Sequence, residues 1–342
     1  MLIIKVFDPG GPPASPPGAR ELTALVETDP VPSGGDAADD VAIWVDRRRP
    51  GRSIVIGTDK EGGIAVYDLG GGELEYRADG KINNVDLRAR TRSAGRQAPI
   101  AAVTNRTTQS VDLYRVDPGA GGLTPISQGR IEPDLAVNGI CMYRGATGRL
   151  GFFVTGLRGE VEQWELVVPA SGEVGARRLD AFRFGSSAEA CVVDEGLGRA
   201  YFAEERVGIW SLPLAGQDRE PTPLAAVADA GPLVADVEGL AIRRRPGGGG
   251  ELIASSQGNN SYAVYRRASG AYLGSFVVAD GAIDGAEDTD GLDVATAALG
   301  PRFPDGLLVV QDGSNDDGNQ NFKLVPLCPG GDLWCGAQRG GS

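Results

Sequence analysis

GTDKEGGIAVYDL, residues 57–69, joins one strand-like run to a second through a glycine-containing turn. Units of this kind recur about 45 to 50 residues apart, the period of four-stranded propeller blades. The others are VTNRTTQSVDLYRV (103–116), VTGLRGEVEQWEL (154–166), AEERVGIWSL (203–212), ASSQGNNSYAVYRR (254–267) and VVQDGSNDDGNQNFKLVPL (309–327). We therefore predict an all-β, six-bladed β-propeller. A β-sandwich is the alternative, but it does not explain the repeat.

Each unit also carries a polar residue where a strand enters its turn. A radial arrangement of blades would bring these residues to one face around a central channel. They are Lys60, Arg106, Arg158, Glu205, Gln257 and Asp312. No stretch has the periodicity of a helix of three turns or more.

Length and composition agree with this architecture. The 342 residues are enough for one large repeat domain, and the 52 glycines and 22 prolines favour many short elements joined by tight turns. We expect an N-terminal extension and proline-rich linker over residues 1–35, the propeller over 36–327, and a C-terminal tail over 328–342.

The net charge of −13 argues against nucleic acid or an anionic membrane as a partner. No apolar run is long enough to span a bilayer, and the apolar N-terminal start is too short for the core of a signal peptide. The chain contains no histidine, so a Ser-His-Asp triad, a phosphohistidine intermediate and an HExxH zinc site are excluded. Nothing indicates an oligomer, and we expect a monomer.

Four cysteines lack the CxxC spacing of a zinc site. Cys141 and Cys191 lie in similar apolar contexts and could pair across neighbouring strands. Cys328 and Cys335 could close a small loop. Buried free thiols are an equally good interpretation of the pattern.

The loop DGAEDTDGLD, residues 284–293, has five carboxylates in ten residues. Such a density of like charge is unfavourable unless a cation gathers it. Oxygen ligands and turn-forming glycines suit calcium, although the EF-hand pattern fails because no glutamate stands at its twelfth position. A solvated acidic loop is the alternative.

Further carboxylates accompany the repeated turns, and Lys60 and Arg106 are expected on the same face. Calcium with two cations suits a multiply charged phosphate ester, because the metal offsets the repulsion between an acidic protein and a polyanion. A metal-bound water could then attack phosphorus.

Many motifs of this chain resemble those of the β-propeller phytases, in unbroken order from residue 36 to residue 326. They are DAADDVAIWV, GTDKEGGIAVYDL, KINNVDLR, TNRT, GEVEQWEL, AEERVGIW, DVEGLAI, ASSQGNNSYAVY, DGAEDTDGLDV and QNFKLVP. The resemblance implies a six-bladed, calcium-dependent enzyme that hydrolyses phytate (myo-inositol hexakisphosphate) by attack of a calcium-activated water, without a phospho-enzyme. It also implies a second phosphate-binding site beside the first.

Carried over to this chain, the resemblance assigns three groups of residues. Active-site calcium would be held by Asp39, Glu189, Glu205, Asp236, Glu238 and Asp290. Lys60 and Arg106 would bind phosphate and, with Glu189, Asp236 and Glu238, form the catalytic set. Structural calcium would be held by Asp40 with the carbonyls of Val41 and Val85, and elsewhere by Asp284 and Asp312.

The chain departs from the family pattern mainly on the substrate side of the third and fourth blades. A phosphate-binding lysine is replaced by Leu157, and the neighbouring Arg158 is expected on a strand, pointing to the opposite face. Other family positions have become Ala136 and Asn138, Ala188-Glu189-Ala190, Glu204-Glu205-Arg206 and Asp39-Asp40-Val41-Ala42. These changes predict retained calcium binding with reduced phytate hydrolysis.

Two main functional hypotheses therefore stand, and hydrolysis of a different ester is a third possibility. The first is a calcium-dependent phosphomonoesterase acting on phytate. The second is a non-catalytic propeller that binds calcium, phosphate or a protein partner with the same face. Calcium at the affinities usual for such sites suggests a secreted or periplasmic protein.

Overall fold

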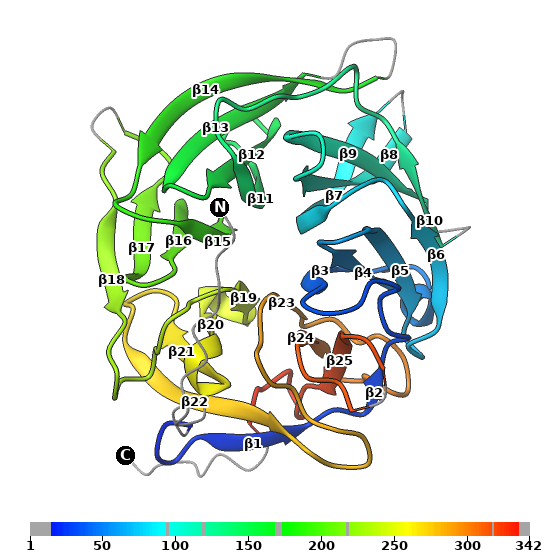
Figure 1. Ribbon diagram of the computed structural model, residues 1–342, viewed down its shortest axis with the longest axis vertical. Helices are drawn as coiled ribbons and strands as arrows, with labels where there is room; N and C mark the ends of the chain where they lie inside the picture. The colour runs from blue at the N-terminus through cyan, green and yellow to red at the C-terminus, as the bar shows by residue number, and fades with distance from the viewer. Residues whose placement is uncertain are drawn as a thin grey trace.

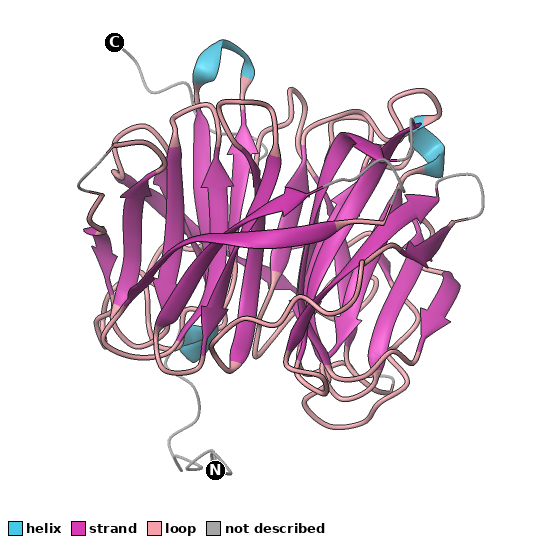
Figure 2. Ribbon diagram, turned by 90° about the horizontal axis from the view of Figure 1, so that it is seen from above, coloured by secondary structure: helices cyan, strands magenta, loops and turns pink. Residues whose placement is uncertain are grey.

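The computed structural model describes residues 15–93, 96–117, 121–167, 173–216, 219–316 and 318–334. Its strands form six sheets arranged in a ring (Figure 1), which confirms the predicted six-bladed β-propeller. Seen from the side, the strands run between two opposite faces of the ring (Figure 2). Within the described residues the only helical elements are three short 3-10 turns, η1 (Pro50–Arg52), η2 (Pro246–Gly248) and η3 (Gln257–Asn259). None of the described helices is long and apolar enough to cross a membrane.

The chain runs through the six blades in order, and each blade has an antiparallel core of consecutive strands. Blades 1 to 3 are β3 (Ala38–Trp44), β4 (Ile54–Asp59), β5 (Gly63–Asp68) and β6 (Glu73–Arg77); β7 (Ile82–Ser93), β8 (Arg96–Asn105), β9 (Ser110–Asp117) and β10 (Gly122–Pro125); and β11 (Val137–Arg144), β12 (Leu150–Gly156), β13 (Glu160–Val167) and β14 (Gly175–Arg183). Blades 4 to 6 are β15 (Ala188–Asp194), β16 (Arg199–Glu204), β17 (Gly208–Pro213) and β18 (Thr222–Ala226); β19 (Leu240–Arg244), β20 (Gly250–Ser256), β21 (Ser261–Arg266) and β22 (Tyr272–Ala279); and β23 (Leu292–Ala295), β24 (Leu307–Asp312) and β25 (Asn321–Pro326).

The first strand of each blade is the innermost. These strands contact one another in a closed circle: β3, β7, β11, β15, β19 and β23. Residues at the start of each inner strand, and in the turns beside them, therefore meet around one axis.

Two strands near the N-terminus complete the ring. β1 (Arg20–Thr23) pairs in parallel with β22, and β2 (Val26–Glu27) pairs in antiparallel fashion with β25. The segment expected as an extension and linker over residues 1–35 thus contributes the fourth strand of blade 6. This pairing fastens the beginning of the chain to its end.

Hydrophobic side chains hold neighbouring blades together. Six buried clusters occupy the six interfaces between blades. The fit is close between blades 1 and 6, where a Cβ on Gly57 would lie 2.3 Å from the ring of Phe322. Any larger residue at position 57 would have to displace that ring.

The six repeated units occupy the turns between the second and third strands of the blades. In each, the first turn residue donates a backbone hydrogen bond to a carbonyl in the segment that leads into that blade's inner strand. These equivalent residues are Lys60, Arg106, Leu157, Glu205, Gln257 and Gly313, with N···O distances of 2.7, 2.7, 3.2, 3.1, 3.0 and 2.8 Å. The prediction that Arg158 and Asp312 hold this position was wrong by one residue in each case. Arg158 lies in the turn and not on a strand.

A disulfide joins Cys141 on β11 to Cys191 on β15, linking the inner strands of blades 3 and 4. Of the two interpretations left open for these cysteines, the cross-strand pairing is the one found, and free thiols are ruled out. The pairing considered for Cys328 involves Cys335, which lies outside the described residues.

Candidate functional site

Lys60 is the centre of one charged group at the end of the ring where the repeated turns lie, which we call the mouth. Its Nζ lies 2.9 Å from Asp36 and from Asp39, and 3.0 Å from Asp290. Burial alone would lower the pKa of Lys60, but its attraction to Asp290, Asp39 and Asp36 outweighs burial and raises the pKa well above the ordinary value. Gln257 donates a hydrogen bond to the other oxygen of Asp290. Lys60 is thus a permanent cation inside an acidic surround.

Glu189 is the centre of a second group, built by blades 2, 3 and 4. Asn83 donates a 2.6 Å hydrogen bond to one carboxylate oxygen, and Asn138 donates a 2.9 Å bond to the other. The carbonyl of the Asn138 side chain accepts a hydrogen bond from Arg106, whose guanidinium also lies 4.0 Å from Glu189. Asn83 and Asn138 are fully buried, so they hold the carboxylate in a fixed place.

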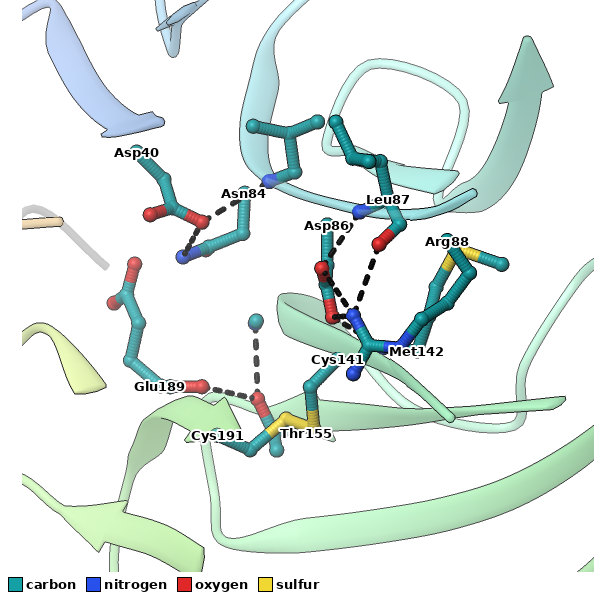
Figure 3. Close-up of a disulfide and its surroundings, with 12 residues drawn as sticks. Asp40, Asn84, Asp86, Leu87, Arg88, Cys141, Met142, Thr155, Glu189 and Cys191 are labelled. Atoms are coloured by element: carbon teal, nitrogen blue, oxygen red, sulfur yellow. Dashed lines mark hydrogen bonds and ion pairs between the residues drawn. A yellow bond between two sulfur atoms is a disulfide. The ribbon is translucent and has the colours of Figure 1, made fainter. Parts of the chain in front are cut away.

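The backbone at Glu189 is held as tightly as its side chain. Figure 3 shows the Thr155 hydroxyl bridging to the Glu189 carbonyl, at 3.0 Å, close to the disulfide. The Gly139 amide donates to the same hydroxyl at 2.9 Å, and a Cβ on Gly139 would lie only 1.9 Å from the Glu189 carbonyl oxygen. A side chain at position 139 would therefore force β11 away from β15.

Three carboxylates converge next to this group. Glu189, Glu205 and Glu238 each offer an oxygen within 4.8 Å of the other two. Ser187 donates a hydrogen bond to Glu205, while Asp236 forms a 3.5 Å ion pair with Arg206. The donors are all hard oxygens from blades 4 and 5, and this set fits calcium better than a softer metal.

Burial, and after it repulsion between the carboxylates, disfavours their charged forms and raises their pKa values. Burial raises the pKa of Glu189 to about 8, and the neighbouring Asp39 adds to this effect. Burial raises the pKa of Asp290 to about 7 although Lys60 opposes the shift. The pKa of Glu238 is raised well above its ordinary value by burial and then by Glu189 and Asp290. Burial also raises the pKa of Glu205. A divalent cation would relieve this repulsion.

Below these groups lies a cavity of about 110 Å³, lined by inner strands that include Asp40, Val41 and Val85. The carboxylate of Asp40 accepts 3.1 Å hydrogen bonds from Asn84 and from the backbone amide of Val85. Burial, and then Asp39, raises the pKa of Asp40 well above its ordinary value. Figure 3 shows Asp40 and Glu189 near one another, with the ion pair of Asp86 and Arg88 further along the same strand as Asn84.

The sequence suggested that the carboxylates of the acidic loop gather around one cation. In the structure they reach three separate places. Asp284 contacts Lys323 at 2.5 Å, Asp290 contacts Lys60, and Asp293 accepts a 2.8 Å hydrogen bond from the Ile43 amide at the cavity. Glu287 and Asp288 are exposed. The loop has no regular secondary structure over residues 284–291, and its successive acidic side chains point in different directions.

Asp284 and Asp312, the predicted second metal pair, lie around the ammonium group of Lys323. This fully buried lysine is 2.5 Å from Asp284, 3.2 Å from Asp312 and 2.6 Å from Glu27, and Asn315 is 3.3 Å away. The predicted pair therefore belongs to blade 6 and the N-terminal strand, separate from the mouth. Lys323 and Glu27 were missed because no local pattern connects β2 with β25.

The structure brings the other predicted residues together as the repeat implied. Lys60, Asp39 and Asp290 form one group, and Arg106, Glu189, Glu205 and Glu238 form another, with Asp236 beside Glu205. Sequence reasoning placed Gln257 on this face but missed Asn83 and the inward-facing role of Asn138. The only signal for these two asparagines was position, since each follows the residue that begins an inner strand.

Comparisons with known proteins identify the family. The phytase family matches residues 14–328. A 3-phytase of Bacillus subtilis (strain 168) is 42% identical over 317 residues, covering 89% of this chain and 83% of that protein. Among solved structures, BBS1N in complex with ARL6DN, from a crystal soaked with lead, aligns with 86% of this chain and 80% of that one at a TM-score of 0.51. At 10% identity, that similarity concerns the fold alone. With a family match over nearly its whole length, this chain belongs to the phytase family.

Proposed function

We propose that this phytase is a calcium-dependent phosphomonoesterase that hydrolyses phytate. The observation that carries the proposal is the convergence of Glu189, Glu205 and Glu238 beside Lys60 and Arg106 at one mouth. An all-oxygen carboxylate cluster binds hard cations, and flanking cations bind phosphate oxygens. The 3-phytase of Bacillus subtilis, 42% identical, supports the choice of substrate.

The proposed division of labour follows from these contacts. Glu189, Glu205, Asp236 and Glu238, with Asp39 and Asp290, would hold the active-site calcium. Bound there, calcium would neutralise phosphate oxygens and lower the pKa of a water molecule that attacks phosphorus. Lys60 and Arg106 would orient the phosphate, and the hydrogen bonds from Asn83 and Asn138 keep Glu189 in place for the metal.

Two structural calcium sites are also proposed. Asp40, with the carbonyls of Val41 and Val85, would hold one at the cavity. Asp284 and Asp312 would hold another, although the Lys323 ammonium already contacts both carboxylates, so calcium there would have to bind beside it or displace it. The all-oxygen donors of both sites suit calcium.

We further propose that the enzyme is slower than a phytase with a lysine at the blade 3 turn. Leu157 is the first residue of that turn, where blade 1 has Lys60 and blade 2 has Arg106. Leu157 is 47% exposed. Asn138 is buried against Arg106 and Glu189, which keeps it from the substrate. The same two features, Leu157 in the turn and the burial of Asn138, also support the non-catalytic alternative, a propeller that binds only calcium and phosphate.

Phosphate release from phytate tests the proposal. The purified protein is assayed with saturating calcium and with chelator, alongside Glu205→Gln and the exposed control Glu132→Gln. We expect calcium-dependent release that Glu205→Gln reduces strongly and Glu132→Gln leaves unchanged. Calcium-dependent phytate binding without release would favour the binding alternative, and release in chelator would contradict the proposed role of the metal.

We place the enzyme outside the cytoplasm, in the periplasm or secreted. The disulfide between Cys141 and Cys191 supports this, because such bonds persist in oxidising compartments. The expectation of a monomer stays a prediction, which light scattering of the calcium-loaded protein would check.

A further inference from the structure

We propose that the disulfide between the inner strands of blades 3 and 4 positions Glu189 against Asn138, and thereby sets how tightly the mouth binds calcium. The inference rests on the proposed function, because it concerns a carboxylate assigned to the active-site metal. Cys141 and Cys191 would touch neither the metal nor the substrate. They are positioning residues that act through β11 and β15, the strands that carry Asn138 and Glu189.

Glu189 and Asn138 lie where their strands are irregular. Both strands contain a β-bulge near the mouth. The pairing register of β11 shifts between Val137 and Ile140, and that of β15 shifts between Ala188 and Cys191. A bulge leaves its extra residue without a partner in the ladder of its own sheet. The hydrogen bonds within blades 3 and 4 therefore do not by themselves fix where these two side chains meet.

The contacts between the two bulges come from side chains, because β11 and β15 belong to different sheets. Asn138 donates its 2.9 Å hydrogen bond to the Glu189 carboxylate. The Thr155 hydroxyl, which accepts from the Gly139 amide at 2.9 Å, donates to the Glu189 carbonyl at 3.0 Å (Figure 3). Each of these is a single hydrogen bond, which weakens steeply when either strand is displaced.

The disulfide is a covalent link between the same two strands, directly beyond the bulges. In β15, pairing resumes after the bulge at Cys191, opposite Phe202. In β11, Cys141 pairs with Phe153, one residue after pairing resumes. The rings of Phe153 and Phe202 pack edge to face with their centroids 5.3 Å apart. The link therefore joins two regular, packed segments and limits how far the two bulges can separate.

This link connects the two halves of the proposed active site. On the blade 3 side, the side-chain carbonyl of Asn138 accepts a hydrogen bond from Arg106. On the blade 4 side, Glu189 belongs to the carboxylate cluster with Glu205 and Glu238. A displacement of β15 from β11 would draw Glu189 away from its amide donor. The cluster would then lose the orientation of one ligand, and such orienting contacts strongly affect metal affinity.

Calcium titration by calorimetry, well below the melting temperature, tests the assignment on the full chain. Binding that Glu205→Gln abolishes is assigned to the mouth. Cys141→Ala/Cys191→Ala should bind calcium there about tenfold more weakly than the wild type, an effect typical of groups that orient metal ligands. The calcium concentration for half-maximal phytate hydrolysis should rise by the same factor, with kcat in saturating calcium near the wild-type value.

The control for lost stability is Phe303→Leu. Phe303 is buried in the cluster between blades 1 and 6, in the loop between β23 and β24 at the end of the ring opposite the mouth. This variant should have a lower melting temperature, because it leaves a cavity in the core, but the calcium affinity of the wild type.

A double-mutant cycle with Asn138→Ala separates positioning from general stabilisation. Removal of the disulfide should weaken calcium binding far less in the Asn138→Ala background than in the wild type, because the contact through which it acts is already gone. A disulfide that only stabilises the fold would lower the melting temperature in both backgrounds and change calcium affinity in neither. Wild-type calcium affinity in the cysteine variant, or equal weakening in both backgrounds, would overturn the assignment.

Reduction of the folded, metal-free wild type gives the same comparison without a substitution, should the cysteine variant fail to fold. Dithiothreitol supplies two electrons and two protons, which convert the disulfide into two thiols, and is itself oxidised to its cyclic disulfide. Alkylation and mass spectrometry verify the reduction. The cysteine variant treated in the same way reports any effect of dithiothreitol elsewhere in the chain.

Hydrogen–deuterium exchange of the metal-free proteins keeps this inference separate from the proposed function. Loss of the disulfide should speed exchange in the peptides that contain Asn138 and Glu189, and leave β24 in blade 6 unchanged. Unchanged exchange in both peptides would contradict the positioning role. This result decides the inference even if the wild type binds no calcium at the mouth or releases no phosphate, outcomes that count against the proposed function alone.

Discussion

Asn138 donates a 2.9 Å hydrogen bond to the carboxylate of Glu189. Its side-chain carbonyl accepts a bond from Arg106, so one buried amide sets the spacing between a proposed metal ligand and a proposed phosphate-binding cation. Its backbone carbonyl also accepts bonds from Thr104 at 2.6 Å and Asn83 at 3.4 Å. A residue that the sequence marks as a lost substrate contact thus has a structural task within the site.

Replacing Asn138 with alanine should lower kcat/KM for phytate by about ten- to a hundredfold, since a buried hydrogen bond to a charged group contributes about 1.5–3 kcal/mol. Calcium titration by calorimetry should show weaker binding, because Glu189 loses one of its two amide donors. Asn138→Asp should be worse, as it places a like charge beside Glu189. Wild-type calcium affinity and kinetics in Asn138→Ala would refute this role.

Restoring a cation at the blade 3 turn should raise kcat/KM for phytate. Leu157→Lys puts an ammonium at the position equivalent to Lys60 and Arg106, and one charge-assisted phosphate contact corresponds to about a tenfold gain in kcat/KM. Leu157→Met, which keeps the volume without the charge, is the control. Equal phosphate release by all three proteins would mean that position 157 does not meet the substrate.

In the metal-free protein, the buried carboxylates at the mouth should make the free energy of unfolding depend on pH. Burial raises the folded-state pKa of Glu189 to about 8, well above the ordinary value of 4.5, so the folded protein keeps a proton that the unfolded chain has lost. That stabilisation is complete below pH 4.5 and disappears as the pH rises through about 8. Asp290, with a pKa of about 7, acts in the same direction.

Urea unfolding in chelator between pH 5 and 9 measures this effect. Glu189→Gln should show a shallower fall in the free energy of unfolding than the wild type over that range. Saturating calcium should remove the fall in the wild type and raise its melting temperature, because the ion binds the folded carboxylates. Identical pH slopes for both metal-free proteins would disprove the assignment to Glu189.

Removing the buried ammonium of blade 6 should be costly. Lys323→Met leaves Glu27, Asp284 and Asp312 without their cation, and breaking a buried charge group in this way destabilises a protein by about 3–5 kcal/mol. Lys81→Met, which removes an exposed pair with Glu61, should change stability by less than about 1 kcal/mol. Denaturation in urea measures both variants.

Calcium tests whether a metal ion can replace the Lys323 ammonium among these carboxylates. If calcium can occupy the space vacated by the ammonium, the melting temperature of Lys323→Met should respond to calcium more strongly than that of the wild type. A variant as stable as the wild type, or one that calcium does not stabilise further, would contradict the view that these oxygens require a cation.

The fold and most residues of the mouth were predictable because they follow from local patterns. Strand-turn-strand units repeat at blade spacing, and the six turn residues share one backbone hydrogen bond. The repeat alone did not define the register within a turn, so Arg158 was assigned the place of Leu157. Contacts between distant segments had no local signal. The chain between Glu27 and Lys323 spans 296 residues, and β2 is only two residues long.

The strand β2 has a consequence for how the protein is made. Blade 6 needs a strand from the first thirty residues and three from the last fifty, so the ring stays open while the ribosome is still adding residues. Blades 1 to 5 can form in sequence, but blades 1 and 5 each keep an uncovered hydrophobic side until blade 6 forms. Loss of β2 or of β25 would therefore leave a gap in the circle and an exposed strand edge, a form prone to aggregation.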